Sequence, residues 1–139
     1  MASIRRQIHI AAGNRAVWRM LTTSDGWTQW YADEARVDGR KGGRVILQSE
    51  DDEGELVDEV GIIVTWRPTS KLEIRWDSSS PAPTKGTALT FTVGSEGDET
   101  RLSLVHSGGG PLDEEEARAA LDKTWRQSLS ALRDALEAD

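Results

Sequence analysis

The apolar residues in the last part of the chain recur with the period of an α-helix. Between Leu112 and Glu137 they are three or four residues apart, so they fall on one face of a helix. This face consists of Ala117, Leu121, Trp125, Leu129, Leu132 and Leu136. Asp113 is a suitable N-cap, and Glu116 three residues later completes the pattern of a capping box. Such a helix is about 35 Å long, and its apolar stripe needs one broad apolar surface to pack on.

Most of the chain before this helix alternates between apolar and polar residues, as half-buried strands do. The clearest row is Leu72, Ile74 and Trp76, and the rows that follow it are Leu89, Phe91, Val93 and Leu102, Leu104, His106. Two short helices are predicted earlier, one starting at Gly13–Asn14 and one after the cap region Thr22–Asp25. The predicted order is therefore strand, two short helices, six strands and the long helix, which is an α+β fold with a seven-stranded antiparallel sheet. A curved sheet covered by one long helix encloses space between the layers, so a pocket is expected there.

One predicted strand, from Glu55 to about Trp66, does not show which of its faces is buried. Its alternation slips near 61–63, where a β-bulge is predicted. Asp58 is expected to point outward, because a buried carboxylate is unfavourable unless it is paired. A polar loop containing two prolines is predicted at residues 78–83.

Composition and charge narrow the partners and the location of the protein. The formal net charge is -7, which disfavours nucleic acid and anionic membranes as partners, since both reward clustered Lys and Arg. No apolar run approaches the roughly 20 residues of a membrane span. There are no cysteines, and the first ten residues lack the apolar core of a signal peptide, so we expect a cytoplasmic protein. The 139 residues suit a single domain, 1–139.

The common catalytic and cofactor motifs are missing from the sequence. There is no phosphate-binding glycine loop followed by Lys and Ser or Thr, and no Gly-x-Ser-x-Gly motif. His9 and His106 are the two histidines, and neither has a neighbour at metal-ligand spacing. We therefore expect no cofactor and no metal site.

Several segments resemble one known family. Residues 10–31, which read I-A-A-G-N-R-A-V-W-R-M-L-T-T-S-D-G-W-T-Q-W-Y, resemble the opening of the activator-of-heat-shock-protein-ATPase-like branch of the SRPBCC (START-like) superfamily. The segments V-D-G-R-K-G-G-R, G-I-I-V-T-W-R-P, K-L-E-I-R-W, T-R-L-S-L-V-H-S-G and T-W-R-Q-S-L-S-A-L follow in the family's order. The resemblance implies the helix-grip (START/Bet v 1-like) fold, in which a seven-stranded antiparallel sheet wraps around a long C-terminal helix.

This fold implies a protein that binds a small hydrophobic or aromatic molecule between sheet and helix. The residues predicted to contact the ligand are Trp30, Trp66, Trp76, Phe91, Leu104, His106, Leu121, Trp125 and Leu129. Aromatic side chains bury 150–250 Å² each, so the tryptophans could line a pocket or fill it. His106 is a candidate for ligand binding or acid–base catalysis, with hydrogen bonding to nearby backbone as its structural alternative.

Two other function classes stay open. One is a polyketide cyclase/aromatase-like enzyme, in which His106 is the only candidate catalytic residue. The other is a protein-interaction or stress- and chaperone-associated module whose cavity is filled. Whether the protein catalyses any reaction is undecided at this point, and a homodimer is one oligomeric state that the sequence leaves open.

Overall fold

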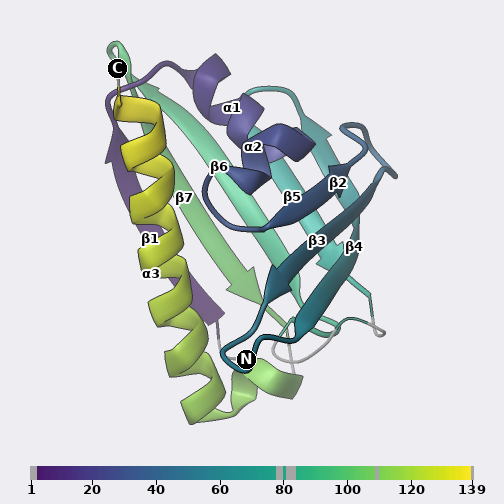
Figure 1. The fold of residues 1–139 in the computed structure, drawn as a ribbon. Helices are drawn as coiled ribbons and strands as arrows, with labels where there is room; N and C mark the ends of the chain where they lie inside the picture. The colour runs from purple at the N-terminus through teal and green to yellow at the C-terminus, as the bar shows by residue number, and fades with distance from the viewer. Residues whose placement is uncertain (1–2, 78–79, 81–83, 109, 139) are drawn as a thin grey trace.

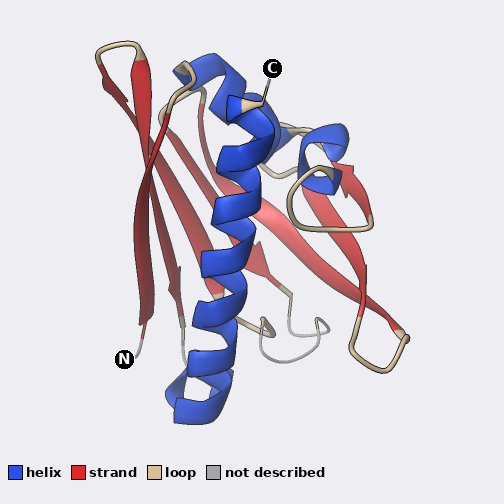
Figure 2. Cartoon of the chain, turned by 60° about the vertical axis from the view of Figure 1, so that its left-hand side comes forward, coloured by secondary structure: helices blue, strands red, loops and turns tan. Residues whose placement is uncertain are grey.

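The computed structural model describes residues 3–77, 80, 84–108 and 110–138, and it shows a curved antiparallel sheet with a long helix across its inner face (Figures 1 and 2). The sheet has seven strands in the order β1-β7-β6-β5-β4-β3-β2. The strands are β1 (Ser3–Ile10), β2 (Glu34–Val37), β3 (Arg44–Glu50), β4 (Leu56–Arg67), β5 (Lys71–Trp76), β6 (Ala88–Glu96) and β7 (Glu99–Ser107). The helices are α1 (Asn14–Thr22), α2 (Ser24–Thr28), the 3-10 turn η1 (Gly110–Asp113) and α3 (Glu115–Glu137). The α+β helix-grip fold predicted from the sequence is confirmed.

The inner face of the sheet carries the apolar rows that the alternation predicted. Each of the following side chains is at most 2% exposed: Leu72, Ile74, Trp76, Leu89, Phe91, Leu102 and Leu104. The α3 residues Trp125, Leu129 and Leu132 are likewise buried, at 1% exposure or less. The period-two rows and the helical stripe therefore meet in one core, as a single covered face requires.

A bulge in β4 decides which of its side chains face the helix. The pairing of β4 with β5 shifts register between Ile63 and Thr65, close to the predicted position. Before the bulge Glu59 lies opposite Leu47 of β3 and is buried, whereas after it Trp66 lies opposite Leu72 of β5. Asp58 points outward as expected, where it accepts a hydrogen bond of 2.9 Å from the side-chain amide of Gln48.

The start of α3 differs from the predicted capping box. Asp113 belongs to the 3-10 turn, and the N-cap residue is Glu114, whose side chain makes no capping hydrogen bond. The reason is that Leu112 is fully buried, which commits its neighbours to a tight turn. Arg118 satisfies that turn by donating a side-chain hydrogen bond of 2.9 Å to the Leu112 carbonyl. The predicted loop at 78–83 lies, apart from residue 80, outside the described residues.

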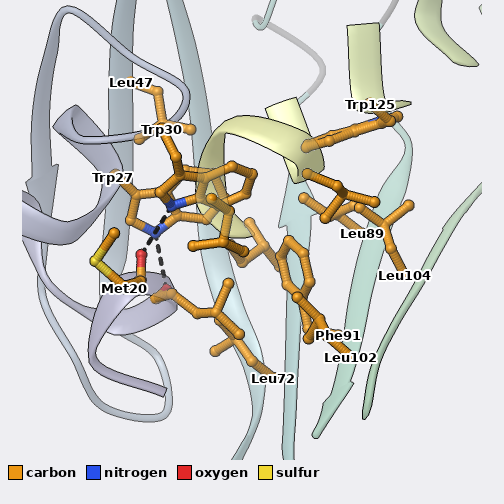
Figure 3. Close-up of a cluster of buried hydrophobic side chains, with 14 of the residues drawn as sticks. Met20, Trp27, Trp30, Leu47, Leu72, Leu89, Phe91, Leu102, Leu104 and Trp125 are labelled. Carbon is orange, nitrogen blue, oxygen red and sulfur yellow. Dashed lines mark hydrogen bonds between the residues drawn. The ribbon is translucent and has the colours of Figure 1, made fainter. Parts of the chain in front are cut away.

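Two tryptophans that follow α1 in the chain fasten their segment to the end of α1 (Figure 3). Trp27 donates its indole N–H to the Leu21 carbonyl at 2.8 Å, and Trp30 donates to the Met20 carbonyl at 3.0 Å. These carbonyls belong to the last turn of α1, where helical partners are lacking. At Gly26 a Cβ atom would lie 2.6 Å from Cα of Met20, so only glycine permits this close approach of α1 and α2.

Candidate functional site

The candidate site is a cavity of about 450 Å³ between the β3–β4 hairpin and the first half of α3. In Figure 1 the β3–β4 hairpin and the first half of α3 both lie at the lower end of the molecule, away from α1. The described lining residues are Tyr31, Ser49, Glu50, Asp51, Val57, Glu59, Thr84, Ala120, Leu121 and Thr124. One part of its wall is apolar and is formed by Val57, Ala120 and Leu121. Another part is polar and is formed by Tyr31, Glu59 and Thr84.

Glu59 is a buried acid on this wall. Its side chain comes from the inner face of β4, and the residue is only 9% exposed. The Tyr31 hydroxyl donates a hydrogen bond of 2.8 Å to one carboxylate oxygen, and the Thr84 hydroxyl donates a second. Burial raises the pKa of the Glu59 carboxyl above its ordinary value, and the two hydrogen bonds act against that rise. No Lys, Arg or His occurs among the described lining residues, so the carboxylate has no cationic partner there.

Tyr31 connects the cavity to the aromatic core. Its ring stacks on Trp125 of α3, with centroids 5.1 Å apart and planes inclined by 19°. Burial, followed by the nearby charge of Glu59, raises the pKa of the Tyr31 phenol well above its ordinary value. The phenol therefore keeps its proton near neutral pH and acts as a hydrogen-bond donor to the carboxylate.

His106 is buried behind the cavity, and both of its ring nitrogens are occupied. The Trp125 indole N–H donates to Nδ1 at 3.0 Å. Nε2 lies 2.7 Å from the Thr87 hydroxyl, whose own proton goes to the Thr84 carbonyl. Nε2 must therefore carry the ring proton and donate it. Burial lowers the pKa of His106 from 6.5 to about 4, so the ring is neutral at pH 7.

The two hydrogen-bonded groups meet at Thr84. Its carbonyl accepts from Thr87 on the histidine side, and its hydroxyl donates to Glu59 on the cavity side. Because that hydroxyl has one proton, the Ser80 hydroxyl 3.1 Å away must donate to it. Together with the stack of Tyr31 on Trp125, the contacts form a closed ring through Trp125, His106, Thr87, Thr84, Glu59 and Tyr31. The buried polar residues in the described part of the chain belong to this ring or, as Ser80 does, contact it, except Thr22 and Thr100.

The structure distributes the predicted ligand-contact residues over three places. Of the nine, Leu121 alone is among the described residues that line the cavity. The buried core holds Trp30, Trp76, Phe91, Leu104, His106, Trp125 and Leu129, several of which appear in Figure 3. Trp66 is half-buried and packs on Trp18 of α1 at 5.3 Å between ring centroids. Ligand contact by any of the nine residues stays a prediction.

The aromatic residues in the groove between the curved sheet and α3 pack on one another. Trp30 lies 6.2 Å from Phe91 and 6.4 Å from Trp125, between ring centroids. Trp76 closes the end of β5, and its indole nitrogen is the one buried side-chain nitrogen or oxygen in the described part of the chain that has no hydrogen-bond partner. The groove is thus filled by side chains at its centre, and the described space lies toward the β3–β4 hairpin.

The sequence interpretation missed the polar residues of the site. Glu59 was overlooked because Val60 and Ile62 are apolar although they point away from the helix. Their side chains make the outer face of β4 look like the buried face in the sequence. The signal that identifies it is its pairing with Leu47, whose own row in β3 is clearly inward. Thr84 follows the loop whose position no periodic pattern could set.

A second hollow, of about 530 Å³, lies between α2 and the strands β2, β3 and β4. Its lining includes Asp25, Glu34 and Arg36, and none of its side chains is buried. Within the described residues, no three or more His, Cys, Asp or Glu side chains are placed to hold a metal ion. No described helix is both long and apolar enough to cross a membrane.

A family comparison agrees with this architecture. The model of the family described as Activator of Hsp90 ATPase homolog 1-like protein matches residues 11–137. The chain belongs to this family. The AHSA1-like assignment confirms the resemblance seen in the sequence motifs. No curated protein matches the chain.

Solved structures share the AHSA1-like fold at low sequence identity. The Aha1 dimer from Colwellia psychrerythraea gives a TM-score of 0.81 at 22% identity, covering 99% of this chain and 98% of that chain. A protein from Nitrosomonas europaea gives 0.83 at 18% identity, with coverages of 98% and 94%. CalU16 from Micromonospora echinospora gives 0.78 at 23% identity, covering 99% of this chain and 75% of that chain. These similarities concern the fold.

Proposed function

We propose that this AHSA1-like protein binds a small hydrophobic or aromatic molecule in the cavity lined by Tyr31, Glu59 and Leu121. The observation that carries the proposal is the combination of an apolar wall with one buried carboxyl and one phenol. Ligand sites are typically concave and apolar, with a few polar groups that fix orientation. A carboxyl buried only to support the fold would be unfavourable in this position, because the described lining offers it no counter-charge.

Binding can be detected without knowing the natural ligand. Tyr31 stacks on Trp125, so a molecule that contacts Tyr31 should change tryptophan emission. Such a molecule should also raise the melting temperature in a concentration-dependent way, because it binds the folded state. We expect a library of aromatic and aliphatic compounds to give at least one saturable hit with Kd below about 100 μM, which corresponds to roughly 5.5 kcal/mol.

Two neighbouring alanines of α3 provide a matched pair of variants. Ala120 lines the cavity, whereas Ala119 lines a separate surface hollow beside Arg118, and both alanines are exposed. Ala120→Trp should block the hit, and Ala119→Trp should leave its Kd unchanged, as measured by calorimetry. If no compound binds, or if both variants bind equally well, the proposal is wrong and an interaction module with a filled groove becomes the better description.

A polyketide cyclase/aromatase-like enzyme is the second candidate, and the pair formed by Tyr31 and Glu59 favours it. A carboxyl with a raised pKa at a cavity wall is a common arrangement for acid–base chemistry. His106 fits this role poorly, since both of its nitrogens are engaged and it does not line the cavity. Turnover of an aromatic polyketide precursor that is lost in Glu59→Gln and retained in Asp58→Asn would favour the enzyme over the binding protein.

Self-association and location belong to the proposal as well. Because a protein of the same fold is described as an Aha1 dimer, we include a homodimer among the expected states of this single-domain protein. Sedimentation at several concentrations tests this, and a monomer at all of them contradicts it. The cytoplasm is the expected location, which fractionation of cells expressing the tagged protein would check.

A further inference from the structure

The charges around the cavity suggest which molecules it selects. Glu59 lies on the wall, and the lining residues Glu50 and Asp51 belong to the nearby end of β3 and the hairpin turn. The parts of α3 and of the β5–β6 loop that line the cavity contribute Ala120, Leu121, Thr124 and Thr84, none of them charged. Tyr31 is the remaining titratable group on the described lining, and it stays protonated near neutral pH.

No ion pair among the described residues includes the carboxylates of Glu59, Glu50 or Asp51. Among the described residues, the ion pairs join Arg6 to Asp122, His9 and Arg101 to Glu96, Arg40 to Asp38 and Arg75 to Glu73. None of them includes Glu59, Glu50 or Asp51. A buried carboxylate is normally paired with a cation, so an incoming positive charge would supply the partner that Glu59 lacks.

Resting on the proposed function, we infer that the cavity selects a cationic amphiphile: a hydrophobic or aromatic body carrying an ammonium or amidinium group that pairs with Glu59. The head group would lie against the carboxylate, while the body lies along Val57, Ala120 and Leu121. A carboxylate ligand of the same size is rejected, because it would bring a second negative charge against Glu59 without a cation between them.

Three molecules with the same tail and different heads test the inference. At pH 8 decylamine is cationic, decanol neutral and decanoate anionic, as expected from ordinary amine and carboxyl pKa values. We expect calorimetry to show that decylamine binds at least about thirtyfold more tightly than decanoate, with decanol in between. Naphthylmethylamine and naphthoate provide the same comparison for an aromatic body.

Glu59→Gln keeps the size of the side chain and removes its charge. It should reduce the preference for decylamine over decanol to less than about threefold, with decanol affinity retained. Asp58→Asn is the matched control, because it removes one negative charge from the adjacent residue on the outer face of β4. We expect this control to keep the full preference. Circular dichroism and thermal unfolding of both variants establish that they are folded.

The outcomes separate this inference from the proposed function. If all three probes bind with similar affinity, or if decanoate binds best, the preference for cations is wrong while cavity binding stands. If none binds, both proposals fail. An amine that binds equally to wild type, Glu59→Gln and Ala120→Trp would be adsorbing to the acidic surface, which also overturns the inference. Should Glu59→Gln fail to fold, the comparison of the probes on the wild type and on Ala120→Trp still decides.

Discussion

Trp125 in the middle of α3 donates its indole N–H to Nδ1 of His106 near the end of β7, at a distance of 3.0 Å. This bond fixes the histidine tautomer and joins the helix to the sheet by a polar contact inside the core. His106 is fully buried and hydrogen-bonded through both ring nitrogens, so neither nitrogen is free in this geometry. Its protonation would break the bond from Trp125, since the imidazolium has no acceptor nitrogen.

The first prediction is a loss of stability in acid that depends on His106. Its pKa is about 4 in the folded protein and 6.5 in the unfolded chain, so between these values the unfolded state binds more protons. The buried, neutral His106 therefore adds about 3 kcal/mol to the free energy of unfolding above pH 6.5, relative to its effect below pH 4. This stability is lost as the pH falls from 6.5 toward 4. Urea unfolding of wild type and His106→Gln at pH 7 and pH 4 measures it. The two proteins should differ less at the lower pH, and an equal difference at both would contradict the prediction.

The second prediction is that Glu59→Gln stabilises the protein at alkaline pH. Burial raises the pKa of Glu59 in the folded state, so above its unfolded pKa the folded protein holds more protons and loses stability as the pH rises. Glu59→Gln has no ionisable group at this position, so it does not lose this stability as the pH rises. Its melting temperature relative to wild type should therefore increase from pH 5 to pH 8, with Asp58→Asn showing no comparable trend. A variant that is less stable than wild type at pH 8 would show that the hydrogen bonds outweigh burial.

The third prediction concerns Trp27, whose indole N–H donates to a carbonyl in the last turn of α1. Trp27→Phe keeps a buried aromatic ring and removes the hydrogen bond to the Leu21 carbonyl. Leaving that carbonyl unpaired in the core should cost about 1–3 kcal/mol of unfolding free energy. Trp66→Phe is the control, because Trp66 is half-buried and contacts Trp18 mainly through its ring. Losses of equal size in chemical denaturation would assign the effect to ring size instead.

The fourth prediction tests the packing of α3 on the sheet. Leu129 and Leu132 are at most 1% exposed, so replacing either with alanine should cost on the order of 2–4 kcal/mol. Leu56 is 66% exposed, and Leu56→Ala should change the stability by less than about 0.5 kcal/mol. Equilibrium denaturation of the three variants provides the comparison. Small losses at both α3 positions would mean that the helix is not packed as described.

The fold was predictable from the sequence because each layer has its own unbroken period. Leu72, Ile74 and Trp76 alternate cleanly, and the stripe of α3 continues from Leu121 to Leu132 without interruption. These patterns require a shared core, whatever the details of the loops. The start of α3 was placed less well, because the buried Leu112 outweighs the capping preference of Asp113.

The site was less predictable, since it depends on where patterns break. The bulge after Ile63 hides the inward position of Glu59, and the exposed Ile62 makes the opposite face look like the buried one. The sequence predicted several tryptophans as wall residues of the pocket because their side chains are large. Trp125 instead lies behind Tyr31 and forms part of the packed core. Three-dimensional pairing, especially that of Glu59 with Leu47, carries the missing information.

The closed ring through Glu59, Thr84, His106 and Trp125 restricts how ligand preference can diverge among descendants of this chain. A ring substitution that does not preserve the hydrogen bonds or the stacking removes a partner from two neighbours, so a new specificity acquired in that way brings a stability defect that second mutations must repair. Rim residues such as Ala120 and Thr124 are exposed and stand outside the ring. Evolutionary change in what the cavity accepts should therefore proceed mainly through the α3 rim, with the acid behind it inherited unchanged.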